Sequence, residues 1–311
     1  MIERYEAIEM RHVLITGGTG LIGSALCKQL VQKSYRVTVM SRNPKTVANK
    51  CGQQVEAIKA LSEITDDTVI DTVINLAGEP IADKRWTDKR KIELQTSRID
   101  LTRDLVSWMT QRQQKPTCLI SGSAVGWYGD GGAEILTEHS GYQDEYTHQL
   151  CEDWEKQALQ AQQAGIRVCV VRTGLVLAKK GGFLQKMLPP FKLGLGGRLG
   201  HGDQYMPWIH LTDMINMITF LLEDSQAQGV FNGCSPHPIT NKEFTSILAK
   251  QLHRYAIFPV PSLVLKGLLG EMSSLLLTGQ NVLPKKAQAL GFSFVYTDAT
   301  LALADVLSIK N

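Results

Sequence analysis

Short apolar runs alternate with amphipathic stretches along most of this chain. The run His-Val-Leu-Ile-Thr at residues 12–16 is apolar and β-branched, as in a parallel strand that is buried on both faces. From residue 21 onward, apolar side chains recur at helical spacing, and the same order of strand and helix repeats to about residue 232. This alternation predicts an α/β fold with a doubly wound parallel sheet.

The boundaries of the predicted elements come from residues that start or stop helices. Gly165 is expected to end one helix, Asn241 to cap another with Glu243 in its first turn, and Asp213 to cap or open a third. The expected strands are residues 12–16, 35–40, 54–58, 72–78, 117–121, 166–172 and 230–232, and the longest expected helices are residues 88–113 and 146–164.

Three glycines, Gly17, Gly20 and Gly23, follow the first strand and lead directly into the first helix. In a strand–turn–helix unit, the first glycine allows the tight turn, the second lets backbone N–H groups approach a pyrophosphate, and the third allows close packing. The helix N-terminus adds unpaired N–H donors and a partial positive charge. This stretch therefore predicts a dinucleotide-binding site.

The second expected strand ends in Ser41 and Arg42, with no acidic residue beside them. An acid at this point hydrogen-bonds the ribose of NAD, whereas an arginine accommodates the 2′-phosphate of NADP. Because a guanidinium makes charge-assisted contacts with phosphate, the sequence favours NADP(H). A solvated surface arginine is the alternative interpretation.

Charge and composition exclude several other classes of protein. The net charge of +3 is too small to indicate a nucleic-acid or membrane-surface partner. No apolar stretch is long enough to span a bilayer, the first residues lack the core of a signal peptide, and the histidines lack metal-site spacing. The histidine spacing therefore supports no metal site. The six cysteines form no Cys-x-x-Cys pair, so we expect a reduced, cytoplasmic protein without a disulfide framework.

Five motifs, at residues 16–23, 75–78, 123 with 128–129, 172–174 and 208–213, resemble those of the extended short-chain dehydrogenase/reductases, which include nucleotide-sugar epimerases and dehydratases. A narrower set resembles the atypical members known as epimerase-family proteins, which close with a small C-terminal domain of unknown function. That set lies at residues 75–80, 85–87, 97–99, 153–155, 270–272, 282–287 and 291–292. The resemblance covers nearly the whole chain from Met10, and it implies a Rossmann fold that binds NADP(H).

The resemblance also implies a division of the chain. Residues 10–178, completed by about 203–232, would form the NADP-binding Rossmann domain. The segment at residues 181–202 is rich in glycine and contains a proline pair, as expected where the chain leaves a sheet. Residues 179–202 and 233–311 would then form a smaller C-terminal α/β lobe for the substrate, and residues 1–9 a dispensable extension.

The residues expected to contact the cofactor cluster at the ends of the first, second, fourth and sixth strands. Ala77 and Gly78 have small side chains, which leave room for a ligand at the carboxyl end of their strand. The full set is Gly17, Thr19, Gly20, Leu21, Ile22, Gly23, Ser41, Arg42, Leu76, Ala77, Gly78, Glu79 and Arg172.

The wider superfamily works with a serine, a tyrosine and a lysine, and the spacing Tyr-x-x-x-Lys sets the last two on one helix face. No tyrosine of this sequence has a lysine four residues later. One alignment puts Tyr146 and Leu150 at these positions, and the other puts Thr147 and Cys151 there. Because an unaided phenol has a pKa near 10, it is a poor base at neutral pH.

Ser123 and Tyr128 remain as candidate catalytic residues. Candidate substrate contacts are Arg85, Trp86, Ser123 and His210. Three of these have a structural alternative: Tyr128 would pack the turn after its strand, His210 would be a hydrogen-bonded core histidine, and Arg85 would pair with a helix acid.

Two functions fit these residues. The first is an NADP(H)-dependent oxidoreductase or epimerase that acts on an unidentified small molecule, such as a carbonyl compound or a sugar nucleotide, with an altered proton-transfer set. The alternative is a sensor or regulator that binds NADP(H) and does little chemistry. By analogy with the superfamily, the helices at residues 88–113 and 146–164 offer a face for a homodimer.

Overall fold

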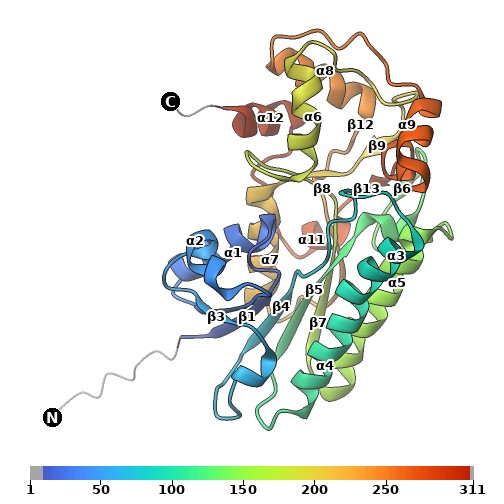
Figure 1. The fold of residues 1–311 in the computed structure, drawn as a ribbon. Helices are drawn as coiled ribbons and strands as arrows, with labels where there is room; N and C mark the ends of the chain where they lie inside the picture. The colour runs from blue at the N-terminus through green and yellow to red at the C-terminus, as the bar shows by residue number, and fades with distance from the viewer. Residues whose placement is uncertain (1–9, 309–311) are drawn as a thin grey trace.

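A seven-stranded parallel sheet forms the centre of the protein, as shown by a computed structural model that describes residues 10–308 (Figure 1). The strand order is β11-β7-β5-β4-β1-β2-β3, so the chain starts in the middle and builds outward in both directions. This order confirms the predicted doubly wound Rossmann sheet. The strands are β1 (His12–Thr16), β2 (Arg36–Met40), β3 (Glu56–Ile58), β4 (Thr72–Asn75), β5 (Cys118–Ala124), β7 (Arg167–Thr173) and β11 (Gly229–Gly233).

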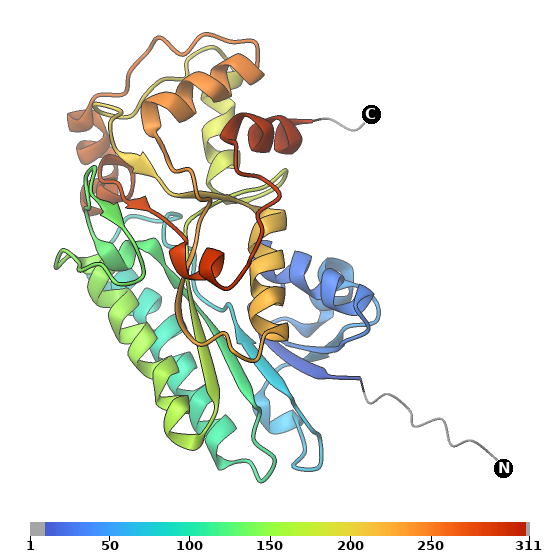
Figure 2. The same cartoon turned by 180° about the vertical axis from the view of Figure 1, so that it is seen from behind.

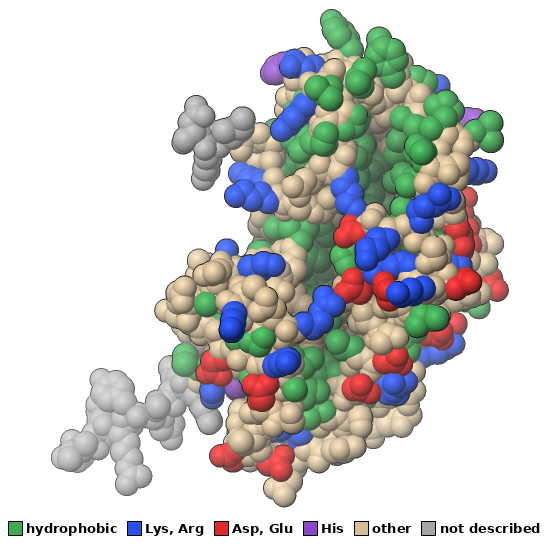
Figure 3. Space-filling view, in the orientation of Figure 1, with side chains coloured by type: hydrophobic (Ala, Val, Ile, Leu, Met, Phe, Trp, Pro, Cys, Tyr) green, Lys and Arg blue, Asp and Glu red, His purple; other side chains and the backbone are tan. Residues whose placement is uncertain are grey.

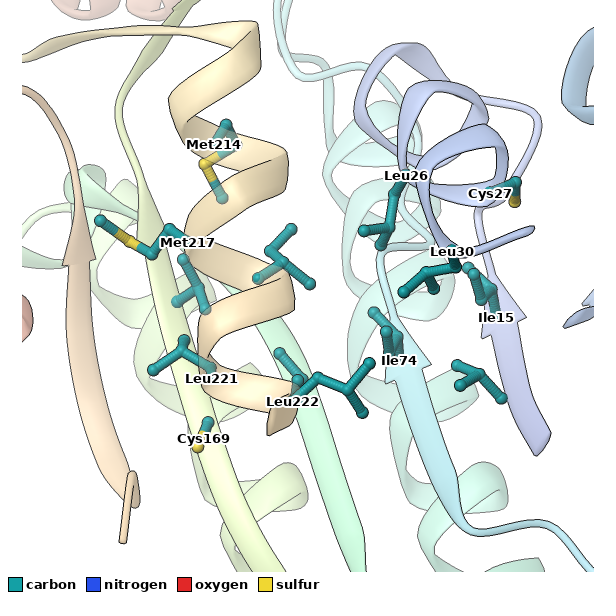
Figure 4. Close-up of a cluster of buried hydrophobic side chains, with 14 of the residues drawn as sticks. Ile15, Leu26, Cys27, Leu30, Ile74, Cys169, Met214, Met217, Leu221 and Leu222 are labelled. Carbon is teal, nitrogen blue, oxygen red and sulfur yellow. The ribbon is translucent and has the colours of Figure 1, made fainter. Parts of the chain in front are cut away.

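Helices cover both faces of the sheet, which explains why its strands are apolar without alternation. Val13 and Ile15 of β1 pack on one face, and Leu14 packs on the other. Figure 4 shows the first face, where Leu26 and Met214 point from two helices toward the strands. The helices on this face are α1 (Leu21–Gln32), α2 (Val47–Cys51) and α7 (Leu211–Glu223).

The opposite face is covered by two long helical runs that lie side by side (Figure 1). The expected helix at residues 88–113 is helical from residue 88 to 111, but its middle contains a wider turn. It consists of α3 (Asp88–Gln95), a π-helical segment (Thr96–Asp100) and α4 (Leu101–Gln111). The second run is α5 (Tyr146–Leu159), followed by a 3₁₀ turn (Gln160–Ala164) that Gly165 ends with a φ of +78°, as predicted.

A second core lies beyond the carboxyl ends of the strands. Leu177, Trp208, Phe244 and Leu303 are buried together there, although they are distant in sequence. The elements outside the main sheet are β6 (Ile135–Leu136), β8 (Leu175–Leu177), α6 (Gly182–Lys192), β9 (Tyr205–Met206), β10 (Trp208–His210), β12 (Ile239–Thr240), α8 (Asn241–Gln251), α9 (Ser262–Leu269), α10 (Ser274–Leu277), β13 (Asn281–Val282), α11 (Lys285–Ala289) and α12 (Ala299–Leu307). Viewed from behind, α11 lies against the edge strand β11 (Figure 2).

The structure corrects two predicted helix caps. The N-cap of α8 is Thr240, whose hydroxyl accepts a bond from the N–H of Glu243, rather than Asn241. The N-cap of α7 is His210, whose Nδ1 accepts from the N–H of Thr212, and Asp213 lies in the first turn of the helix that it was expected to cap or open. In both cases the residue that caps the helix lies one to three positions before the predicted one, because both residues have side chains that can accept the capping bond.

The proline pair lies inside a helix. Pro189 and Pro190 belong to α6, near its C-terminal end, and both are exposed to solvent. Water can therefore bond the carbonyls that lose an N–H partner, which reduces the cost of proline at these positions. Within residues 10–308, no helix combines the length and the apolar character that a bilayer crossing needs.

Candidate functional site

The glycine turn between β1 and α1 has the geometry of an anion cradle. Gly17 has a φ of +70°, and a Cβ atom there would lie 2.4 Å from the carbonyl oxygen of Leu76, at the end of β4. A Cβ on Gly23 would lie 2.4 Å from the carbonyl oxygen of Gly17. Gly17 and Gly23 therefore allow the turn, the strand and the helix to pack closely together.

Gly20 has a different role, because its Cβ position is nearly open. The nearest neighbour would be the carbonyl oxygen of Gly17 at 3.2 Å. Gly20 is also the N-cap of α1, and no side chain caps this helix. The first-turn N–H groups of α1 therefore face an open position that suits a phosphate, and these residues fit a dinucleotide.

Arg42 lies beside this turn at the end of β2, and its side chain is 92% exposed. Its Nη1 donates a hydrogen bond of 2.7 Å to Oε1 of Glu79, from the loop that follows β4. This bond is the main reason why the pKa of Glu79 lies below its usual range. Two of the residues expected to contact the cofactor, Arg42 and Glu79, are thus bonded to each other.

The loop that follows β4 packs against a buried arginine. A Cβ on Gly78 would lie 3.0 Å from Cζ of Arg98, and Nη2 of Arg98 donates to the carbonyl oxygen of Glu79 at 2.8 Å. The sequence predicted that the small size of Gly78 leaves room for a ligand. In the structure, the guanidinium of Arg98 occupies that space instead. Arg98 belongs to the π-helical segment.

Ser123 lies in a buried polar cluster at the end of β5. Its side chain is part of a residue only 4% exposed, and its hydroxyl donates a bond of 2.6 Å to Oε1 of Glu155. Arg172 donates from Nε and Nη2 to the two oxygens of the same carboxylate, both at 2.9 Å. Its Cζ also lies 3.4 Å from the ring centroid of Trp127. The hydroxyl of Ser123 and the guanidinium of Arg172 are therefore both bonded to Glu155 inside the core.

Glu155 is the member of this cluster that sequence reasoning did not assign. It lies on the buried side of α5, where an acid without a partner would be costly. Glu155 stands at a position of an amphipathic helix where an apolar residue is expected. This pattern in the sequence could have indicated a buried acid with a charged partner.

Tyr128 is also buried, at 1% exposure, and its hydroxyl bonds Oδ1 of Asn232 at 2.8 Å and the carbonyl oxygen of Thr137 at 3.0 Å. Burial raises the pKa of Tyr128 to about 12. This arrangement matches the structural alternative, a tyrosine that packs the turn. Neither Ser123 nor Tyr128 presents a free hydroxyl to solvent.

A small cavity of about 240 Å³ opens at the start of α5. Trp86 and Tyr146 line it with their rings 5.0 Å apart, and the Nε1 of Trp86 donates to the carbonyl oxygen of Ile81. The remaining lining residues are Glu145, Thr147, Glu271 and Ser274. Figure 3 shows that the surface is hollowed between the two halves of the molecule and that apolar side chains line the hollow.

The other predicted substrate contacts, Arg85, Ser123 and His210, are not among the residues that line this cavity. His210 is 5% exposed, and its Nε2 lies 3.3 Å from Oδ2 of Asp305 while its ring packs on Tyr296. Burial lowers the pKa of His210. This environment matches the expected alternative, a core histidine. Arg85 lies against the backbone of Gly270, beside the cavity rim at Glu271.

Comparisons with known proteins place this geometry in context. A family described as the NAD dependent epimerase/dehydratase family matches residues 13–233, and a domain of unknown function, DUF1731, matches residues 260–306. The epimerase family protein SAR0825 of Staphylococcus aureus (strain MRSA252) is 37% identical over 300 residues, which is 96% of this chain and 100% of the relative.

Solved structures are similar as well. The human epimerase family protein SDR39U1 (isoform 2), crystallised with NADPH, superposes with a TM-score of 0.83 and 32% identity over 95% of this chain and 98% of its own. The UDP-glucuronic acid 4-epimerase of Bacillus cereus in complex with NAD has a TM-score of 0.75 over 94% of each chain, and at 18% identity it shows the fold alone.

Proposed function

Since the chain belongs to the NAD dependent epimerase/dehydratase family, we propose that it binds NADP(H) across the carboxyl ends of its strands and transfers hydrogen to or from a small carbonyl or hydroxyl compound. The glycine turn carries this proposal. It combines a tight turn at Gly17, an open Cβ position at Gly20 and an uncapped first turn of α1. These are the features that a pyrophosphate requires.

The preference for NADP(H) rests on Arg42. It is the charged side chain at the end of β2, where NAD-binding proteins carry an acid. The similar human protein was crystallised with NADPH, in agreement with this assignment. Glu79 is the competing group, because its carboxylate already holds Arg42 and also suits a ribose hydroxyl.

A direct test is to titrate the protein with NADPH and NADH and to follow the increase of thermal stability. NADPH should stabilise the protein more than NADH at equal concentration, because only NADPH offers a 2′-phosphate to Arg42. Equal stabilisation by both cofactors would contradict the assignment of NADP(H). Absence of stabilisation by either would contradict the proposed site itself.

The second candidate function is a sensor that binds NADP(H) without turnover. The observation in its favour is that Ser123 and Tyr128 are buried and bonded within the core. Incubation of NADPH with a panel of small carbonyl compounds distinguishes the two functions. Loss of absorbance at the reduced nicotinamide band supports the enzyme, and stable absorbance with saturated binding supports the sensor.

A further inference from the structure

We propose that a cavity beside α8 binds a soluble phosphate ester with an apolar body, separately from the cofactor. The cavity has a volume of about 640 Å³, which is within the range of small-molecule sites. Figures 1 and 2 show α8 beyond the carboxyl ends of the strands, at the opposite end of the molecule from α4. None of the residues that line this cavity belongs to the glycine turn or to the smaller cavity at the start of α5.

Four positively charged side chains line this cavity, and no acidic side chain does. They come from the loop before β9, from α8 and from the loop that follows α8, and they are Arg198, Lys242, Lys250 and Arg254. Among the residues that the structure describes, no carboxylate lies at ion-pair distance from any of the four. A cavity lined by charges of one sign attracts a ligand of the opposite sign.

An acid does occur next to one of these cations, but it has another role. Glu243 follows Lys242 on α8. Its Oε2 accepts hydrogen bonds from the backbone N–H and the hydroxyl of Thr240, both at 2.8 Å. This carboxylate completes the cap of α8 and does not line the cavity. The cavity therefore keeps its positive charge.

One side of α8 forms a wall of the cavity. Lys242, Ser246 and Lys250 recur every four residues along it, so they lie on one face of the helix. Phe244 and Leu248 lie on another face and are fully buried in the second core. Because this packing fixes the rotation of α8, its two lysines are held toward the cavity.

The other walls are held in place by the backbone. A Cβ on Gly202 would lie 3.2 Å from Cδ of Arg198 and 3.2 Å from Cβ of Lys242, so this glycine lets the two cationic side chains start close together. Gly202 also has a φ of +81°, which favours glycine. The Nε of Arg254 donates to the carbonyl oxygen of Lys192, at the end of α6, at 3.1 Å. These contacts form the cavity without a ligand.

The loop that follows α8 adds an apolar wall. Tyr255, Ile257 and Pro259 line the cavity, and the first two side chains belong to residues that are 82% and 68% exposed. Phe258, in the same loop, is 53% exposed. A group of exposed apolar residues marks an interaction site more often than a solvated surface. A ligand with an apolar body would cover part of this group.

A phosphate ester matches both properties of the cavity. At neutral pH a phosphate monoester carries a charge of about −1.5 to −2 and three strong acceptor oxygens. Arginine and lysine side chains both bind phosphate, arginine through a fork of two donors. The phosphate would lie among the four cations, and the apolar body would lie against Tyr255 and Ile257.

The probe for this site is 1-naphthyl phosphate, which joins a phosphate monoester to a fluorescent aromatic body. In a titration followed by fluorescence anisotropy, it should bind the protein, and 1-naphthol, which lacks the phosphate, should bind much more weakly. Gly20→Val, which alters the glycine turn, should bind the probe as tightly as the unaltered protein does. This variant separates the cavity from the proposed cofactor site, so the outcome does not depend on whether NADP(H) binds.

Variants of the lining residues locate the probe. The double variant Arg198→Gln with Lys242→Gln should bind it about tenfold more weakly, because it loses two charge-assisted contacts that solvent partly screens. Lys115→Gln with Lys266→Gln is the matched control, since it removes two charges from exposed positions outside the cavity and should leave the affinity unchanged. Tyr255→Ser should weaken binding of the probe severalfold and should not change binding of inorganic phosphate.

Three results would contradict the proposal. Equal losses of affinity in the two double variants would mean that binding follows net charge alone. Loss of binding in Gly20→Val would place the probe at the glycine turn. Binding to vesicles of phosphatidylcholine and phosphatidic acid, with no binding of the soluble probe, would identify a membrane surface as the partner instead.

The altered lysines and arginines are all exposed, so the variants should fold, and circular dichroism checks this. If the cavity double variant does not fold, Lys250→Gln and Arg254→Gln provide the same comparison at two other exposed cations of the cavity. Each should weaken binding of the probe severalfold, and unchanged affinity in both would refute the site.

Discussion

Replacement of Arg42 by alanine tests the cofactor preference most sharply. A charge-assisted hydrogen bond to a phosphate contributes about 1.5–3 kcal/mol. Two features of the structure reduce this value. The side chain is 92% exposed, and it must give up or share its bond to Glu79 when the phosphate arrives. Since an exposed ion pair contributes about 0–1 kcal/mol, the net loss should be about 1–2 kcal/mol.

This loss corresponds to NADPH binding that is roughly five- to thirtyfold weaker in Arg42→Ala, with NADH binding nearly unchanged. Calorimetric titration of both cofactors measures the ratio directly. Arg36→Ala is the matched control, because Arg36 is an exposed arginine at the other end of the same strand and pairs with Glu56. It should change neither affinity.

The partner residue gives the opposite expectation. Glu79→Gln removes the carboxylate that competes for Arg42, so NADPH should bind severalfold more tightly and the ratio of NADPH to NADH affinity should rise. The reasoning is refuted if Arg42→Ala leaves that ratio unchanged, or if Glu79→Gln weakens NADPH as much as it weakens NADH.

Three further outcomes are expected. Gly20→Val places a side chain between the first-turn N–H groups of α1 and the phosphate, so cofactor titration should show no binding while circular dichroism shows a native fold. Glu155→Gln breaks a buried ion pair with Arg172 and should lower the free energy of unfolding by about 3–5 kcal/mol in urea, whereas Glu152→Gln, at a half-buried position of α5 where the acid pairs with exposed Lys156, should have little effect. Burial lowers the pKa of His210 in the folded protein, so at mildly acidic pH the unfolded chain binds a proton at this residue more readily than the folded protein does. The stability that neutral, buried His210 contributes should therefore be lost as pH falls from about 6.5 through the pKa of the folded protein. Melting temperatures at pH 7 and pH 5.5 should therefore differ less in His210→Asn, which keeps a cap, and an equal difference would contradict this assignment.

Features that depend on local sequence were predicted well. The seven strands, the glycine turn after β1 and the end of a helix at Gly165 each follow from short runs of residues and their backbone preferences. Adjacent cap-forming residues were harder to separate. Thr240 and Asn241 are both good N-caps, and the capping box that Thr240 forms with Glu243, three residues later, selects Thr240.

The polar contacts of the site could not be predicted, because they join distant parts of the chain. Glu155 bonds Ser123 from 32 residues away and Arg172 from 17 residues away, so no spacing rule reveals the cluster. In the sequence, Arg98 stood out only as part of the family motif at residues 97–99. No sequence pattern predicts the π-helical turn in which it lies. Its position against Gly78 follows from that turn and from the packing of α5.

The π-helical turn also fixes how the long helical run can change in length. The buried residues Arg90, Leu94 and Thr102 recur at multiples of four, with Arg98 between them. In an α-helix, four residues overshoot one turn by about 40°, so three such steps would turn the inward stripe by roughly 120°. The wider turn absorbs part of this drift. Deletion of one residue between 96 and 100 would convert the wider turn into an ordinary α-helical turn, so α3 and α4 would keep nearly the same faces toward the sheet. Relatives of this protein that lack one residue in this segment should therefore retain the packing of both helices, whereas a deletion inside α3 or α4 would rotate the buried residues that follow it by about 100°.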